Sequence, residues 1–421
     1  MMDAILNWCD NLLENDIWFY LITTVIKLVL MFAVILAFVV LSVWIERRVA
    51  GWIQDRPGPN RAGIPLTLFK RYGSKEKQPL KNVLHYFGIP ETCWIAKLCT
   101  WLKLDRDIPT FGLMQPCLDG GKLFLKQENT PSYVRKIYFI IAPMLVLGPP
   151  MVAAAVVPFA SSASTCWGDI NMVVANIGIG PLWIFAISGL SVYGITMAGW
   201  SSNSKFPFLG GLRATAQLIS YEVAMGLSII PLLMMFGTLN MQDIVSNQAA
   251  NGWTLLPLWG EGLSLQRWAL MVPMVLSFII FVTCVFAEAN RTPFDMAECE
   301  TDLVGGYHTE YSSMKFASFF MGEYAAMVIG SALVVTLFLG GWSIGFGADE
   351  ALHAWCDWVA VICQFLMFII KLLAFIFFFV WVRWTLPRFR WDQVMKLGWL
   401  VFLELAVANI FLTAAILYFI K

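Results

Sequence analysis

The residues of this sequence best suited to chemistry are carboxylic acids gathered between two apolar runs. Residues 287–324 read AEANRTPFDMAECETDLVGGYHTEYSSMKFASFFMGEY, and only Arg291 and Lys315 oppose the acids there. Charge beside membrane-type segments is normally kept where it faces a cavity, an ion path or a partner. We therefore expect proton or ion chemistry, with a solvated loop as the alternative. The acids are Glu288, Asp295, Glu298, Glu300, Asp302, Glu310 and Glu323.

Four further charged residues lie within apolar segments, namely Lys27, Glu222, Lys371 and Glu404. For Lys27 and Glu404, snorkelling or a structural ion pair explains the charge as well as a function does, whereas Glu222 and Lys371 extend this hypothesis. Glu222 follows the loop that contains Gly210-Gly211, where we expect a break before a helix begins, and Lys371 lies near the middle of another apolar run. Close carboxylates repel each other, which raises some of their pKa values and lets them hold protons near neutral pH. The pattern favours a proton- or ion-conducting membrane subunit. A transporter with a midplane substrate site is the alternative, and the absence of a clear repeat between the two halves counts weakly against it.

The elements that position these acids are predicted to be membrane helices. Of the 421 residues, 59% are hydrophobic and 13% are charged, about half the charged fraction of soluble proteins. The formal net charge is zero, which indicates no nucleic-acid partner. We predict an all-α, polytopic membrane protein, one membrane domain over 1–421, with about eight transmembrane helices plus amphipathic surface helices. The expected spans are 18–44, 136–160, 173–200, 213–237, 267–288, 316–340, 359–383 and 397–420.

The distribution of Lys and Arg predicts the orientation. The segment 45–135 holds 15 of these residues, whereas the N-terminal tail and the loops 161–172 and 341–358 hold none. Because basic residues concentrate on the cytoplasmic side, we expect both termini on the outer face of a bacterial cytoplasmic (inner) membrane. A large cytoplasmic loop then covers 45–135, and the acidic loop, defined here as residues 288–316, is also cytoplasmic.

The large cytoplasmic loop divides into three parts. Residues 42–64 carry charged side chains just past the first span and a turn at Pro57-Gly58-Pro59. An insertion at about 66–109 includes an amphipathic piece, ETCWIAKLCTWLKL, suited to the membrane surface. Residues 111–131 indicate a short amphipathic helix with Asp119, Lys122 and Lys126 on its polar side.

Cysteine and histidine spacing predicts no metal centre in this chain. The nine Cys form no C-x-x-C pair, and the three His are far apart in the sequence. There is also no nucleotide fingerprint, phosphate loop or nucleophile–base triad. We expect no metal, flavin or other redox centre here.

Five long motifs, in order along the chain, resemble one protein family. They are ERRVAGWIQDRPGPNRAG (46–63), FGLMQPCLDGGKLFLK (111–126), GWSSNSKFPFLGGLRATAQLISYEVAMG (199–226), residues 287–324, and WVRWTLPRFRWDQVMKLGW (381–399). The chain resembles the H subunit (mitochondrial subunit 1) of respiratory complex I, the proton-pumping NADH:quinone oxidoreductase. The 66–109 insertion departs from the usual pattern, in which the first motif runs almost directly into the second, and Asp302 stands where the family more often has Glu.

The resemblance implies specific roles. It implies a subunit that supplies part of the quinone tunnel and begins the acidic path to the pumping subunits, with ubiquinone or menaquinone as substrate. The implied partners are the other membrane-arm and peripheral-arm subunits, quinone and membrane lipid. A related subunit of a membrane-bound hydrogenase-type complex, or an ion-coupled transporter, remains the alternative. The implied quinone-binding residues are Arg47, Arg48, Trp52, Asp55 and Arg56, and the implied proton path comprises Glu222, Glu288, Asp295, Glu298, Glu300, Asp302, Glu310 and Glu323.

Overall fold

The computed structural model describes residues 16–60, 63–64, 108–109, 111–165, 168–257 and 265–419. It divides into two compact units, one formed by residues 1–39 with 127–421 and the other by residues 40–126. Within the described ranges, eight helices are long and apolar enough to cross a membrane. Each overlaps one predicted span, so the prediction of an all-α polytopic membrane protein is confirmed.

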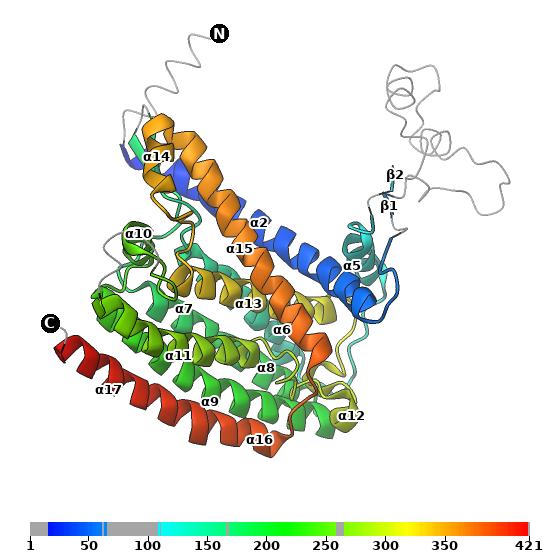
Figure 1. The fold of residues 1–421 in the computed structure, drawn as a ribbon. Coiled ribbons are helices and arrows are strands. Elements are labelled where there is room, and N and C mark those ends of the chain that lie inside the picture. Colours follow the sequence, from blue (N-terminus) through cyan, green and yellow to red (C-terminus); the bar gives the residue numbers. More distant parts are fainter. Residues whose placement is uncertain are drawn as a thin grey trace, which may run out of the picture. The chain divides into compact units, whose positions relative to one another are not determined.

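The larger unit is a bundle of long helices joined by short helices and one hairpin (Figure 1). Apolar runs form helices in a membrane because a helix satisfies its own backbone polar groups. The helices of the bundle are α6 (Lys136–Ala153), α7 (Gly180–Ser188), α8 (Leu190–Ser201), α9 (Lys205–Phe236), α11 (Leu265–Glu288), α13 (Ser313–Phe338), α15 (Asp357–Thr385) and α17 (Leu403–Phe419). The helix α2 (Asp16–Ile53) begins in this unit and continues into the smaller one.

Short elements connect these helices. The hairpin of β3 (Ser162–Thr165) and β4 (Gly168–Asn171) is antiparallel, with Ser162 opposite Asn171. The other connecting elements are η1 (Ala154–Val156), α10 (Met241–Asn251), α12 (Glu300–Leu303), η3 (Gly306–His308), α14 (Ala348–Trp355), α16 (Trp391–Lys396) and the π-helix η4 (Leu397–Phe402).

Packing in the larger unit places α9 and α13 at the centre. In Figure 1, α9 lies beside α11 and α17, and it also contacts α8. The helix α13 contacts α6, α11 and α15, and all its residues from Met327 to Phe338 are buried. Its N-terminal half carries Glu323, so that this acid is held inside protein and not against lipid.

The helix α9 begins eight residues earlier than predicted, and Gly210 and Gly211 lie inside it and do not break it. A Cβ added at Gly210 would approach the Gly306 Cα to 2.9 Å, and one at Gly211 would lie 3.3 Å from the Gly199 Cα. The glycine pair therefore allows close backbone approach to η3 and α8. Sequence reasoning missed this because a glycine pair has the same appearance at a turn and at a tight helix crossing.

The smaller unit contains the end of α2, the strands β1 (Gly63–Ile64) and β2 (Ile108–Pro109), and α5 (Gln115–Leu125). The strands pair antiparallel. The helix α5 forms within the predicted 111–131 segment, with Asp119 and Lys122 3.8 Å apart. The predicted surface helix in the 66–109 insertion lies outside the described residues.

Candidate functional site

The acidic loop is folded into the protein. Gln217, fully buried on α9, donates from Nε2 to the carbonyl oxygens of Ala287 (2.9 Å) and Phe294 (2.8 Å). From the other side, the backbone N–H of Phe389 donates to the Pro293 carbonyl at 3.3 Å. Buried polar backbone is stable only when it is paired in this way. These anchors exclude the alternative of an ordinary solvated loop.

Asp295 is held by an arginine from a distant segment. Its carboxylate lies 2.6 Å from the Arg388 guanidinium, which also approaches the Cys299 sulfur at 3.6 Å. Only 3% of the Asp295 residue surface is exposed. Burial raises the pKa of Asp295 above its usual value, and Arg388 acts in the opposite direction.

Glu323, Arg291 and Tyr307 form a second buried group. The Tyr307 hydroxyl donates to Glu323 Oε1 at 2.8 Å, and Arg291 Nη2 lies 3.3 Å from Glu323 Oε2. The Arg291 guanidinium also lies 4.2 Å from the centre of the Tyr324 ring. Both members of the ion pair are about 95% buried, so removing one would leave an uncompensated charge.

Glu298 links this group to the rest of the acidic loop. Its side chain is hydrogen-bonded to that of Glu323, and its Oε1 lies 3.6 Å from His308 Nδ1. Burial raises the pKa of Glu298 above its usual value. Two carboxyl groups can share a hydrogen bond only when one carries a proton. The structure thus places two buried carboxyl groups from different segments beside each other.

Glu222 and Glu288 form a third group at membrane depth. Glu288 ends α11 and is hydrogen-bonded to Ser188, and Glu222 is the nearest acid that influences it. A Cβ added at Gly189 would lie 2.9 Å from Glu222 Oε1, so the break between α7 and α8 makes room for this acid. A cavity of about 30 Å³ lined by Ser188, Ser191 and Glu288 adjoins the group, enough space for about one water molecule.

Asp302 and Glu310 lie outside these groups. Asp302 is 3.4 Å from Arg213 near the surface, and Glu310 accepts a hydrogen bond from the exposed Tyr133 hydroxyl at 2.8 Å. Glu300 is the first residue of α12. The structure thus brings together five of the eight predicted path residues, in the pairs Glu222 with Glu288 and Glu298 with Glu323, with Asp295 beside Arg388.

Several contributing residues were not selected from the sequence. Arg388 lies 93 positions from Asp295, and Tyr307, Gln217 and Ser188 are uncharged residue types that are common in any helix or loop. The WVRWTLPRFRWDQVMKLGW motif contains Arg388 and was the one available signal for it. Its partner becomes visible only when α15 and the acidic loop are packed together.

Lys371 is a residue of α15 whose side chain lies at the C-terminal end of α13. The acidic loop precedes the other end of α13. The Lys371 ammonium group donates to the carbonyl oxygens of Leu339 (2.8 Å), Gly341 (3.0 Å) and Ser343 (2.7 Å). The last carbonyls of a helix lack partners within it, and an ammonium has three donors. Lys371 therefore holds the turn that follows α13.

The predicted quinone-binding residues lie at the end of α2, in the smaller unit. Arg47 Nη1 is 2.5 Å from an Asp119 carboxylate oxygen on α5, and Arg48 donates to the Pro59 carbonyl at 3.1 Å. The Trp52 ring lies 5.8 Å from the Arg48 guanidinium and stays mainly exposed. Arg56 donates to the Gln54 side chain, and Asp55 adopts a positive φ of 52° at the turn. The Pro57–Pro59 turn folds back on the helix end.

Within the described ranges, no group of three or more His, Cys, Asp or Glu side chains could hold a metal ion. The fold and the site define a polytopic helical membrane protein with buried, mutually paired carboxylic acids and the arginines that hold them. These are the features of a protein that carries charge within a membrane.

Comparison with known proteins assigns the family. The sequence matches the NADH dehydrogenase family over residues 26–83 and 105–414, leaving unmatched a part of the 66–109 insertion. The chain belongs to this family. The H subunit of NADH-quinone oxidoreductase from Flavobacterium psychrophilum is 38% identical over 402 residues, covering 96% of this chain and 99% of the relative. The Leptospira biflexa subunit is 40% identical over 91% of both chains. The Rhodospirillum rubrum subunit is 44% identical over 73% of this chain and 81% of its own.

Proposed function

We propose that this chain is a membrane subunit of a proton-translocating NADH:quinone oxidoreductase in the bacterial inner membrane, assembled with membrane-arm and peripheral-arm subunits. It forms part of the quinone tunnel and holds the first acids of the path that couples quinone reduction to pumping. The substrate is ubiquinone or menaquinone. The observation that supports the proposal is the buried Glu298–Glu323 pair, because two adjoining carboxyl groups on different segments can pass a proton between them.

In this proposal different acids take part in different steps of proton transfer. Asp295 and Glu298, on the acidic loop, respond to charge changes that accompany quinone reduction. Glu323 and Tyr307 receive the proton within α13 and η3, and the Glu222–Ser188–Glu288 group carries it at membrane depth. The Arg291 and Arg388 guanidinium groups stabilise the charged forms of Glu323 and Asp295. Asp302 and Glu310 lie apart from these groups and near the surface. They are proposed to take up protons where the path begins.

The tunnel assignment predicts an effect of Trp52→Ala on quinone affinity. Trp52 is 59% exposed, so its loss removes little packing within the protein but removes an aromatic face beside Arg48. Aromatic contacts contribute about 1 kcal/mol, so we expect the KM for quinone to rise roughly fivefold in the assembled complex. The measurement is NADH:quinone reductase activity against quinone concentration in membranes.

Trp358→Ala on α15, which removes a similarly exposed tryptophan, is the matched control and should leave the KM unchanged. A photoreactive quinone should also label residues within 46–63 in the wild-type complex. An unchanged KM in Trp52→Ala together with no label in this range would reject the tunnel assignment.

The orientation of the chain is proposed from the Lys/Arg distribution. Single cysteines at Gln127 and at Thr309, both exposed positions, should react with an impermeant thiol reagent only from the cytoplasmic side. A cysteine at the exposed Glu350 of α14 should react only from the outside. The background lacks the exposed Cys117 and Cys356. Labelling of Thr309→Cys in intact cells would reverse the proposed orientation.

A further inference from the structure

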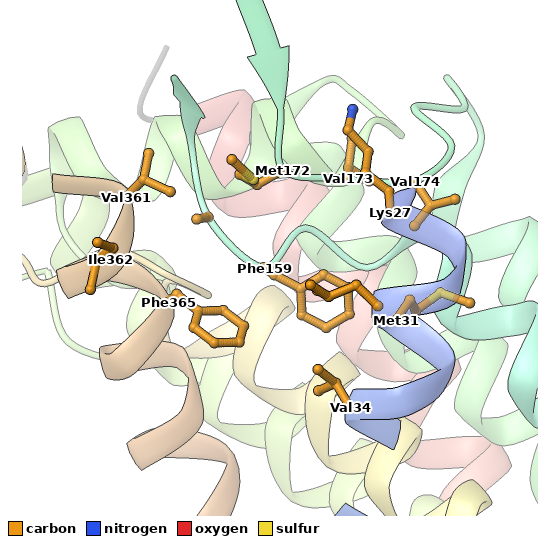
Figure 2. A pocket seen from close by; sticks show the side chains of 12 residues that line it. Lys27, Met31, Val34, Phe159, Met172, Val173, Val174, Val361, Ile362 and Phe365 are labelled. Carbon is orange, nitrogen blue, oxygen red and sulfur yellow. The ribbon is translucent and has the colours of Figure 1, made fainter. Parts of the chain in front are cut away.

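A second cavity of the larger unit has no acidic residue in its lining and takes no part in the proposed path. It has a volume of about 210 Å³ and is bounded by α2, by α15 and by the segments that flank the β3–β4 hairpin. Its lining is apolar apart from one amine. Figure 2 shows Lys27 at one end and Val34 at the other, with Met31, Phe159, Val361 and Phe365 among the side chains of the wall.

The walls of this cavity are well ordered by packing within the protein. Ala160, Ala163 and Val361 form a buried cluster, and Met172 and Phe365 pack against it. The Phe159 N–H donates to the Met172 carbonyl at 3.2 Å, which ties the two arms of the hairpin together. The cavity is therefore a feature of the folded unit.

The surroundings of the cavity are surfaces that face lipid. On α2, Val25, Ile26 and Val29 are each more than half exposed, and on α15 Ile362 is 55% exposed and also lines the cavity. In the isolated chain these aliphatic side chains are open to acyl chains, which match them in polarity. The cavity thus opens on the phase that supplies acyl chains.

Lys27 lies at the depth of the lipid head groups. About 20 apolar residues cross the hydrocarbon core, and after Lys27 the next charged residues in the sequence are Glu46, Arg47 and Arg48. The segment between Lys27 and Glu46 is therefore about long enough to cross the hydrocarbon core, with Lys27 at one boundary and Glu46 at the other. Among the described residues, no ion pair or hydrogen bond to Lys27 is found, and in Figure 2 its nitrogen points away from the rings of Phe159 and Phe365.

We propose that this cavity binds one anionic phospholipid from the leaflet on the side of the β3–β4 hairpin, with an acyl chain between Met31, Val34 and Phe365 and the phosphate on the Lys27 ammonium. Moving an acyl chain from bilayer to an apolar cavity gains little by itself, because lipid tails are as apolar as the lining. The ion pair between Lys27 and the phosphate therefore determines which lipid is selected. The cavity determines where the acyl chain of that lipid lies.

The test uses the intact complex in membranes and two photoreactive lipids with a diazirine in one acyl chain, phosphatidylglycerol and phosphatidylcholine. After illumination, labelled peptides are identified by mass spectrometry. We expect phosphatidylglycerol to label residues within 159–174 or 361–365. Lys27→Gln should reduce this labelling roughly fivefold, the effect of one lysine–phosphate contact, and leave the weaker phosphatidylcholine labelling unchanged.

Two further variants separate cavity binding from general contact with the bilayer. Val34→Trp fills the inner end of the cavity and should abolish labelling there by both lipids. Val29→Trp makes the same change at a lipid-facing position outside the lining and should not affect it. The proposal is overturned if Lys27→Gln leaves phosphatidylglycerol labelling intact, if a quinone analogue displaces the label, or if the cavity peptides cross-link to another subunit instead.

Discussion

Glu298→Gln and Glu222→Gln are expected to assemble into the complex and to lose quinone reduction and proton pumping together. Glutamine keeps the shape and most hydrogen bonds of glutamate but cannot release a proton. Glu298 adjoins Glu323, and Glu222 lies in the same group as Glu288, so each variant removes one titratable group from a pair. Groups that transfer protons typically contribute about 100-fold or more to rate. We expect activity per assembled complex to fall by at least about tenfold.

The rival explanation is that these acids only bind a neighbouring subunit through ion pairs. It predicts the opposite pattern, in which the glutamine variants assemble poorly and the assembled fraction turns over normally. Reductase activity in membranes and the proton-to-electron ratio in proteoliposomes, each normalised to assembled complex, distinguish the two. Glu350→Gln, an exposed acid of α14, is the matched control and should behave as wild type. Full activity with an unchanged ratio in both Glu298→Gln and Glu222→Gln would rule out the shared-proton path.

Gly306→Ala is expected to displace the acidic loop. Gly306 has φ +62°, and an added Cβ would overlap the Ala297 carbonyl oxygen, next to Glu298. Its Cα also lies against Gly210 of α9, so the chain cannot move away freely. The left-handed conformation costs an L-residue about 1–2 kcal/mol, and overpacking adds about 1–3 kcal/mol. We expect a loss of roughly 2–5 kcal/mol in the stability of this region, seen as reduced assembled complex and a lower temperature of thermal inactivation.

The matched control for this substitution is Gly226→Ala. Gly226 lies inside α9, and a Cβ there would meet no atom within 4 Å, so alanine should be neutral or slightly stabilising. Any Gly306→Ala complex that does assemble should also have low reductase activity, because Glu298 adjoins the displaced carbonyl. Normal assembly and activity in Gly306→Ala would show that the acidic loop adapts to the added methyl group.

The sequence by itself determined the architecture and the region of chemistry. Apolar runs of about 20 residues form spanning helices because the bilayer offers no other partner for backbone polar groups, and all eight predicted spans appear among the described residues. The concentration of acids in 287–324 with few bases was sufficient to locate the candidate site. The sequence could not distinguish Asp302 and Glu310 from Glu298 and Glu323, because all four are acids in the same stretch. In the structure, Asp302 and Glu310 lie apart from the buried groups, whereas Glu298 and Glu323 adjoin each other.

The tertiary structure alone decided which side chains meet. Arg388 reaches Asp295 because the segment after α15 packs on the acidic loop, and Gly189 leaves space for the Glu222 carboxyl between α7 and α8. Gly210-Gly211 lies inside α9 and not at a turn because η3 and α8 approach it closely. Such contacts join residues far apart in sequence, and they depend on how helices rotate and cross. Periodicity and composition carry no information on that geometry, since they describe one segment at a time.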